Sequence, residues 1–226
     1  MIHNETVRLK YPLIGATEVQ IDHSEALYAA LSRIFPFIHQ CEGIQITNIK
    51  GLFSVNAQLH IGDQGSFIIQ SPIQHVPQLL RLAGKSITIQ NQKFRIGIPE
   101  IYSINFAPNL VARIVCVKGK QCESEMFEYL VEELKRKHGA ILHKDYELHI
   151  LRRRIITIHN KKIVGFGVAI TNISSGDLSI ALQADPPSGR KKYGCGYFLP
   201  YEQKRFTAGQ ALYSEGEEFD TETTVS

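Results

Sequence analysis

The order of predicted strands and helices, which occurs twice along the chain, is the feature that most limits how it can fold. In the first half, alternating apolar residues predict strands, and apolar residues at a period of 3.6 predict helices. The predicted elements are a strand at 5–13, a helix whose start Asp22 or Ser24 can cap, strands at 44–49, 53–61 and 67–70, a helix at 78–83 and a hairpin at 86–98. This order is the βαββαβ pattern of a ferredoxin-like domain.

The second half repeats the order of elements without repeating the sequence. Its predicted elements are a strand at 110–118, a helix at 123–138, strands at 147–158 and 162–173, a helix at 178–184 and a strand at 193–199. We therefore expect an α+β protein with two tandem ferredoxin-like (RRM-like) domains, at residues 1–107 and 108–200. Residues 201–226 lose the apolar periodicity and carry mostly acidic charge, so we expect a disordered tail there.

Positive charge is concentrated in the second predicted domain. Residues 108–200 hold 15 basic and 9 acidic residues, whereas residues 1–107 hold 8 and 7, and residues 201–226 hold 2 and 6. A basic excess in one domain favours a polyanion as partner, although it is also compatible with a role in solubility alone. In the first domain, charge removal at Lys10 or Lys93 is expected to matter little for binding.

The cysteines and the apolar segments indicate a cellular compartment. Cys41, Cys116, Cys122 and Cys195 form no CxxC pair, and no apolar run approaches the roughly 20 residues of a transmembrane helix. The first ten residues lack the apolar stretch of a signal peptide. We therefore expect a cytoplasmic protein with reduced thiols, no membrane partner, no disulfide framework and no zinc site.

Two histidines bracket the first predicted helix, with His23 at its start and His39 after it. The pKa of histidine suits proton transfer near neutrality, so His39, together with His23 or Tyr28, could supply the base and the acid for RNA cleavage. Ser24 belongs to the same group of candidate residues. Lys50 could stabilise the charge that develops on the phosphorane. The alternative is that both histidines are incidental surface or capping residues. Their spacing does not match the HExxH pattern of zinc enzymes.

A basic strand and the turn after it form a second candidate site. Arg152 and Arg154 share one face of the predicted strand, and Arg153 takes the other. A pair of guanidinium groups can hold phosphates through paired hydrogen bonds, and Lys161 and Lys162 extend the positive charge into the turn. The alternative is a solvated edge strand that its charge protects from aggregation.

A glycine-rich basic loop is the third candidate site, and its residues are Gly189, Arg190, Lys191, Lys192 and Tyr193. Glycine lets the backbone approach phosphates, cations hold the phosphates, and tyrosine can stack on a base. Glycine-rich segments are often only turns, but the combination here favours nucleic acid. The chain has no Walker-type, GxSxG or dinucleotide-binding motif, so the corresponding enzyme classes lack support.

In this order, the motifs resemble the CRISPR repeat-processing endoribonucleases of the RAMP superfamily over about residues 7 to 200. The N-terminal similarity lies in Pro12-Leu13, Gly15, Asp22-His23, Leu27-Tyr28, Ala30-Leu31-Ser32, Pro36 to His39 and Leu82-Ala83-Gly84-Lys85. The C-terminal similarity lies in Ser179 to Gln183, Gly189 to Lys192 and Gly194-Cys195-Gly196-Tyr197-Phe198. Cyanobacterial and myxobacterial members are the most similar.

The resemblance implies two ferredoxin-like domains that face each other, and cleavage at the base of a repeat hairpin without metal or cofactor. The products would end in a 2′,3′-cyclic phosphate and a 5′-hydroxyl. The family's usual catalytic histidine maps onto His39, and its accompanying histidine-serine pair onto His23 and Ser24. The family's glycine-dense stretch before the basic run is replaced here by Asp185 to Ser188, which leaves the RNA contacts of this loop open.

We therefore predict a metal-independent endoribonuclease that cuts CRISPR precursor RNA within the repeat and retains its product. The predicted partners are the repeat hairpin and, beyond it, subunits of a CRISPR effector complex. One alternative is a non-catalytic RNA-binding RAMP subunit of such a complex. Another is a tandem RRM-like regulator of unrelated RNA, against which no strand carries the aromatic RNP1 pattern.

Overall fold

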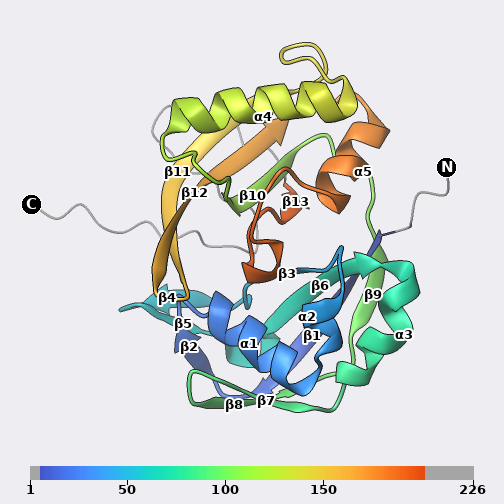
Figure 1. Cartoon of the computed structure of the whole chain (residues 1–226). Coiled ribbons are helices and arrows are strands. Elements are labelled where there is room, and N and C mark those ends of the chain that lie inside the picture. Colours follow the sequence, from blue (N-terminus) through green and yellow to red (C-terminus); the bar gives the residue numbers. More distant parts are fainter. Residues whose placement is uncertain (1–5, 202–226) are drawn as a thin grey trace, which may run out of the picture.

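Each half of the chain builds its own large hydrophobic core. The computed structural model describes residues 6–201. The tail predicted at 201–226 lies outside the described residues except for Tyr201, which is buried and was wrongly assigned to the tail. One core gathers buried side chains between Val7 and Ile96, and the other gathers buried side chains between Ala107 and Phe198. Figure 1 shows the two halves stacked, with the first half below and the second above.

The central strand of the first half is β1 (Thr6–Gly15). On one side it pairs antiparallel with β6 (Ser66–Pro72). On its other side, β9 (Glu100–Ser103) pairs with its first part and β8 (Gln92–Ile96) with its last part. The strand order is β3-β6-β1-β8-β7, with β3 at Gln45–Ile46 and β7 at Ser86–Ile89.

Two helices that follow each other in the chain cover this sheet. Helix α1 (Ser24–Ile34) packs against the core through the buried side chains of Leu27, Ala30 and Leu31. It ends at Phe35, whose φ of −145° and ψ of 82° are not helical, because a residue that precedes a proline avoids helical angles. After Pro36 the chain forms the short helix α2 (Phe37–Gln40).

Two helix predictions in this half need correction. The predicted side-chain cap of α1 by Asp22 or Ser24 is wrong, because His23 occupies the capping position and makes no capping hydrogen bond. The helix predicted at 78–83 forms instead as two short turns, α3 (Val76–Leu79) and a 3-10 turn (Leu80–Leu82).

The second half contains a four-stranded antiparallel sheet. Its order is β11-β12-β10-β13, with β10 at Leu110–Val115, β11 at Glu147–Ile158, β12 at Lys161–Thr171 and β13 at Phe198–Pro200. Helix α4 (Glu123–His138) lies across the outer side of this sheet (Figure 1) and buries Met126, Leu130 and Leu134. Helix α5 (Gly176–Ala184) lies beside it, and the Ser175 hydroxyl caps it by accepting the Leu178 N–H.

Helix α4 has the bounds that its sequence pattern predicts, since Gly139 follows it with a left-handed φ of 64°. Among residues 6–201, no helix combines the length and the hydrophobicity of a membrane span.

The remaining differences from the predicted elements lie in strands. The single strand predicted at 53–61 folds as a hairpin of β4 (Phe53–Val55) and β5 (Gln58–His60), because the chain turns at Asn56 and Ala57, which both have positive φ. This hairpin forms a separate three-stranded sheet with β2 (Glu18–Gln20). The short exposed strand β9 was not predicted.

Buried hydrogen bonds join the two halves. The Arg8 guanidinium is 3% exposed and donates to Gln70 Oε1 over 2.9 Å and to the Phe198 carbonyl over 2.8 Å. The Gln70 amide in turn donates to the Gln183 carbonyl over 2.7 Å. Because buried polar groups are costly without partners, these bonds restrict the halves to this relative orientation.

Candidate active site

A loop from the second half, residues 185–197, reaches the helices of the first half. Figure 1 shows it in orange-red between the second sheet and helices α1 and α2. The Gly189 N–H donates to the Cys116 carbonyl over 2.7 Å, which fastens the loop just beyond the end of β10. Gly194 has a φ of 80°, a conformation that favours glycine. The strand predicted at 193–199 therefore begins only at Phe198.

The side chains of Tyr28 and His39 meet at this loop. The Tyr28 hydroxyl lies 2.8 Å from Nδ1 of His39, within hydrogen-bond distance. His39 is exposed and Tyr28 is half-buried, so the pair is accessible to a ligand. The structure thus brings together two of the residues that were predicted to be catalytic, one from α1 and one from α2.

Tyr193 and His159 extend this cluster from the second half. The ring centroid of Tyr193 lies 4.9 Å from that of Tyr28 and 6.3 Å from that of His159. Nδ1 of His159 lies 2.8 Å from the Glu25 carboxylate, which also accepts the His159 backbone N–H. The sequence indicated neither Glu25 nor this place for His159, because the two residues are 134 positions apart in the chain.

The three cations of the loop have different surroundings. Lys192 donates to three backbone carbonyls at the end of α2, those of Ile38, His39 and Cys41. Lys191 forms an ion pair with Asp185, which precedes the basic run in the same loop. Arg190 is exposed. The predicted phosphate contacts of this loop therefore remain proposals for Arg190 and Lys191, whereas Lys192 binds protein.

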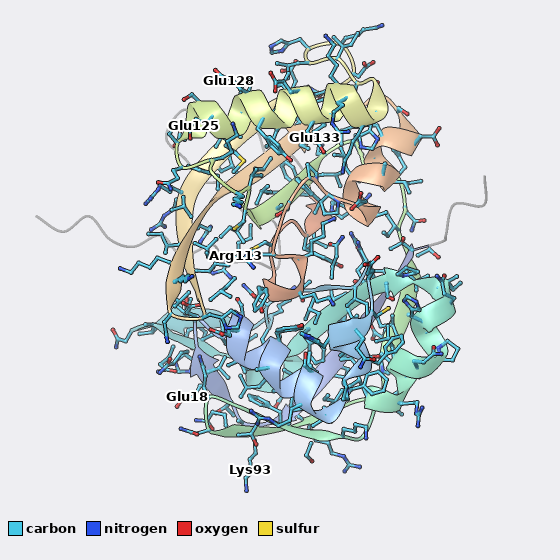
Figure 2. All side chains as sticks on the ribbon, viewed as in Figure 1. Glu18, Lys93, Arg113, Glu125, Glu128 and Glu133 are labelled. Carbon is cyan, nitrogen blue, oxygen red and sulfur yellow. The ribbon has the colours of Figure 1, made fainter. Side chains whose placement is uncertain are left out.

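A cavity of about 360 Å³ lies between the two halves. Four basic side chains line it, those of Lys10, Lys50, Arg113 and Arg154. Figure 2 shows Arg113 between the halves and Lys93 at the outer edge of the first half. Lys50 lines this cavity whereas His39 does not, so the structure does not place Lys50 beside the Tyr28–His39 pair. Lys10, which was expected to matter little, lines the same cavity.

Comparison with known proteins identifies the family. A family model described as Cas6 Crispr matches residues 7–203. The chain belongs to the Cas6 family. It is 30% identical over 194 residues to the CRISPR-associated endonuclease Cas6 of Myxococcus xanthus (strain DK1622), across 86% of this chain and 81% of that protein. The predicted family and enzyme class, an endoribonuclease of CRISPR precursor RNA, are thereby confirmed.

Solved structures support a Cas6-like mixed α/β fold. A structure described as CRISPR associated protein Cas6 matches with a TM-score of 0.57 at 12% identity, over 88% of this chain and 99% of its own. A Cas6-related protein from Pyrococcus furiosus matches with a TM-score of 0.57 at 11% identity, over the same shares of the two chains. At these identities the likeness concerns the fold alone.

Within this Cas6 fold, His23 has a position that does not suit proton transfer. It is 1% exposed, its Nδ1 lies 2.9 Å from the Gln20 carbonyl, and its Nε2 accepts the Ile49 N–H over 2.8 Å. Burial lowers the pKa of His23 to about 4, so the ring is neutral near pH 7. Both nitrogens are engaged by the backbone, and the hypothesis that His23 exchanges protons with RNA is not supported by this geometry.

Ser24 is also directed into the protein. It is 3% exposed, and its hydroxyl donates to Asn48 Oδ1 over 2.7 Å. Asn48 contacts the loop in turn, because a Cβ added to Gly194 would lie 2.3 Å from the same oxygen. Of the predicted histidine-serine pair, Ser24 therefore connects α1 to the loop through Asn48, whereas His23 binds backbone within the first half.

The arginines of the basic strand β11 do not all face the cavity in the way that strict strand alternation predicts. A bulge between Ile150 and Arg153 interrupts the pairing of β11 with β12. Arg154 is half-buried and lines the cavity, whereas Arg152 is exposed and is not part of the lining. Lys161 and Lys162 are exposed at the start of β12. Within residues 6–201, no cluster of three or more His, Cys, Asp or Glu side chains has the arrangement of a metal site.

Proposed function

We propose that this Cas6 family member cuts CRISPR precursor RNA within the repeat without a metal ion, and leaves a 2′,3′-cyclic phosphate and a 5′-hydroxyl. The hydrogen bond of 2.8 Å between Tyr28 and the exposed His39 is the observation that supports this proposal. It pairs a group suited to proton transfer near neutral pH with a residue that orients it. The pair lies where the second half of the chain meets the first.

The proposed reaction needs two proton transfers. The 2′-oxygen attacks the phosphorus while a base takes its proton, and the bond from phosphorus to the 5′-oxygen breaks as an acid protonates that oxygen. Nδ1 of His39 is engaged with Tyr28, which leaves Nε2 for the RNA. When the Tyr28 hydroxyl accepts from Nδ1, the free Nε2 is the base. In the imidazolium, Nδ1–H still donates to the Tyr28 hydroxyl, and Nε2–H is the acid.

Phosphate groups of the RNA are proposed to bind basic side chains of the loop and of the cavity between the halves. Arg190 is exposed on the loop, and the cavity between the halves supplies Lys10, Lys50 and Arg154. Positive charge in a partly enclosed space attracts a polyanion and holds the cleaved product. Glu125 and Glu128 are exposed on the first part of α4 (Figure 2) and disfavour RNA there, whereas Glu133 is paired with Arg136 and Lys137.

We further propose that the two halves are ferredoxin-like domains, with the boundary at residues 107 and 108. The sheet orders β3-β6-β1-β8 and β11-β12-β10-β13 support this, because both read second, third, first and fourth when strands are numbered by their role in each half. The two cores support it as well, since one ends at Ile96 and the other begins at Ala107, next to this boundary.

The test uses repeat RNA transcribed from the CRISPR array of the source genome. Purified protein with EDTA should cut it, whereas RNA with a single 2′-deoxy substitution at the scissile nucleotide should stay intact. The 3′ end of the 5′ product should resist a ligase that requires a 3′-hydroxyl until its cyclic phosphate is opened and the remaining phosphate is removed. Cleavage that EDTA abolishes, or that tolerates the 2′-deoxy substitution, contradicts the mechanism. Binding without any cleavage indicates a non-catalytic RAMP subunit instead.

A further inference from the structure

We propose that Lys192 is a positioning residue for His39 and not a phosphate ligand. This inference rests on the proposed function, because it assigns Lys192 a role through the proposed catalytic histidine. The sequence places Lys192 in a basic run of three, where contact with RNA is the natural expectation. Its surroundings in the fold give it a different role.

The ammonium group of Lys192 has no donor left for RNA. Its Nζ lies 2.9 Å from the Ile38 carbonyl, 3.0 Å from the His39 carbonyl and 2.8 Å from the Cys41 carbonyl. A lysine ammonium has three N–H groups, and these three acceptors use all of them. Lys192 is half-buried, and burial lowers the pKa of its ammonium below the usual value.

Helix α2 depends on such an external partner. The last carbonyls of a helix find no hydrogen-bond donor within the helix. A cation at that end donates to them and interacts favourably with the negative end of the helix dipole. Helix α2 has only four residues, from Phe37 to Gln40, and an isolated helix of that length is unstable. Because one of the bonded carbonyls belongs to His39 itself, Lys192 restrains the backbone from which the imidazole extends.

The two residues after Lys192 restrain the partner of His39. The Tyr193 ring packs on Tyr28, with centroids 4.9 Å apart. Gly194 packs against Asn48, which accepts the Ser24 hydroxyl at the start of α1. Residues 192–194 therefore contact both α1 and α2, and they set the distance between Tyr28 and His39. The second half of the chain thus positions a reactive pair that lies entirely in the first half.

The test compares K192M, which removes the ammonium, with K192R, which keeps the charge. The planar guanidinium does not match three acceptors that converge on one atom. K93M is the matched control, because Lys93 is an exposed lysine at the outer edge of the first half (Figure 2). Single-turnover cleavage is measured at saturating protein, and the Kd is measured with repeat RNA that carries 2′-deoxy at the scissile nucleotide.

A positioning role predicts that K192M cleaves roughly 100-fold more slowly, as displaced catalytic groups do, with its Kd nearly unchanged. K192R should also cleave more slowly, and K93M should match the wild type in both measurements. In an H39A background, K192M should add no further loss, because Lys192 acts through His39. Thermal melting identifies any variant that fails to fold, and K192R then carries the comparison.

Three results overturn the inference while the proposed function stands. They are a folded K192M or K192R that cleaves at the wild-type rate, a K192M variant that changes only the Kd, and full additivity with H39A. If the wild-type protein itself does not cut repeat RNA, the proposed function fails and the inference fails with it. The cleavage assay of the wild-type protein therefore shows whether the proposed function or only the inference about Lys192 has failed.

Discussion

The Tyr28 hydroxyl and Nδ1 of His39 lie 2.8 Å apart, although helix α1 ends and Pro36 intervenes between them. The break in the helix lets α2 turn so that its histidine faces back toward α1. A continuous helix would place residues 11 positions apart close to three turns from each other along the axis. Pro36 therefore helps to bring His39 next to Tyr28, because it ends α1 before α2 begins.

Replacing His39 with alanine should slow cleavage by roughly 10²–10⁴-fold, because one proton-transfer group is lost. The Kd for repeat RNA should change little, since the imidazole is one small part of the surface. Single-turnover rates and filter binding measure the two effects separately. A variant that cuts at the wild-type rate would make His39 a bystander and His159, which neighbours Tyr193, the next candidate.

The Y28F variant keeps the ring that packs on Tyr193 and removes the hydroxyl that bonds to His39. One hydrogen bond contributes about 1 kcal/mol, so the cleavage rate should fall by roughly 5-fold while the protein stays folded. Y129F on helix α4 is the matched control and should cleave normally. A loss as large as that of H39A would instead indicate that Tyr28 transfers a proton itself.

The K50M and R154M variants remove positive charge from the cavity between the halves. Each should weaken repeat RNA binding and reduce the slope of log Kd against log salt by about 0.7–0.9 unit per lost phosphate contact. The K93M variant should leave the slope unchanged. Equal effects at all three positions would indicate diffuse attraction without a defined RNA path.

Protein stability should depend on pH through His23. Its pKa is lowered to about 4 in the folded protein, against about 6.5 in the unfolded chain. The unfolded chain binds more protons between these values, so the free energy of unfolding should be highest above about pH 6.5 and fall as the pH drops toward 4. Urea unfolding at pH 7 and pH 5 measures this loss. The H23A variant should be less stable at pH 7 and should show a smaller difference between the two pH values.

The G194A variant should disturb the loop. The φ of 80° is unfavourable for alanine by about 1–2 kcal/mol, and the new Cβ would lie 2.3 Å from Asn48 Oδ1. Lower melting temperature and slower cleavage are expected together. G176A is the matched control, because a Cβ there has no neighbour within 4 Å at the start of α5, so it should be neutral or stabilising.

The parts of the fold that the sequence predicted well are those with a long local pattern. Helix α4 and strand β11 have the predicted bounds. They are 16 and 12 residues long, so their apolar pattern repeats often enough to identify the type of element and its ends. The hairpin of β4 and β5 was missed, because its turn at Asn56 and Ala57 contains no glycine and the alternation runs through it.

The sequence predicted two members of the candidate site but not how they meet. The residue types of Tyr28 and His39 indicated proton transfer, and both lie in the site. Lys192 was predicted to bind phosphate and His23 to transfer protons, because nothing in the sequence near them shows that distant backbone will bind them. The acceptors of Lys192 lie more than 150 positions away in the chain, and only the tertiary structure brings them together.

Around Arg8 the junction between the halves is chemically one-sided. Arg8, Gln45 and Gln70 of the first half supply side chains, and Gln183, Ala184 and Phe198 of the second half supply backbone carbonyls. A carbonyl persists whatever side chain its residue carries. These three bonds therefore do not depend on the side chains of their acceptor residues, whereas each of the three polar residues in the first half is needed individually. At the loop the roles are reversed, because the Lys192 side chain of the second half binds backbone carbonyls of the first.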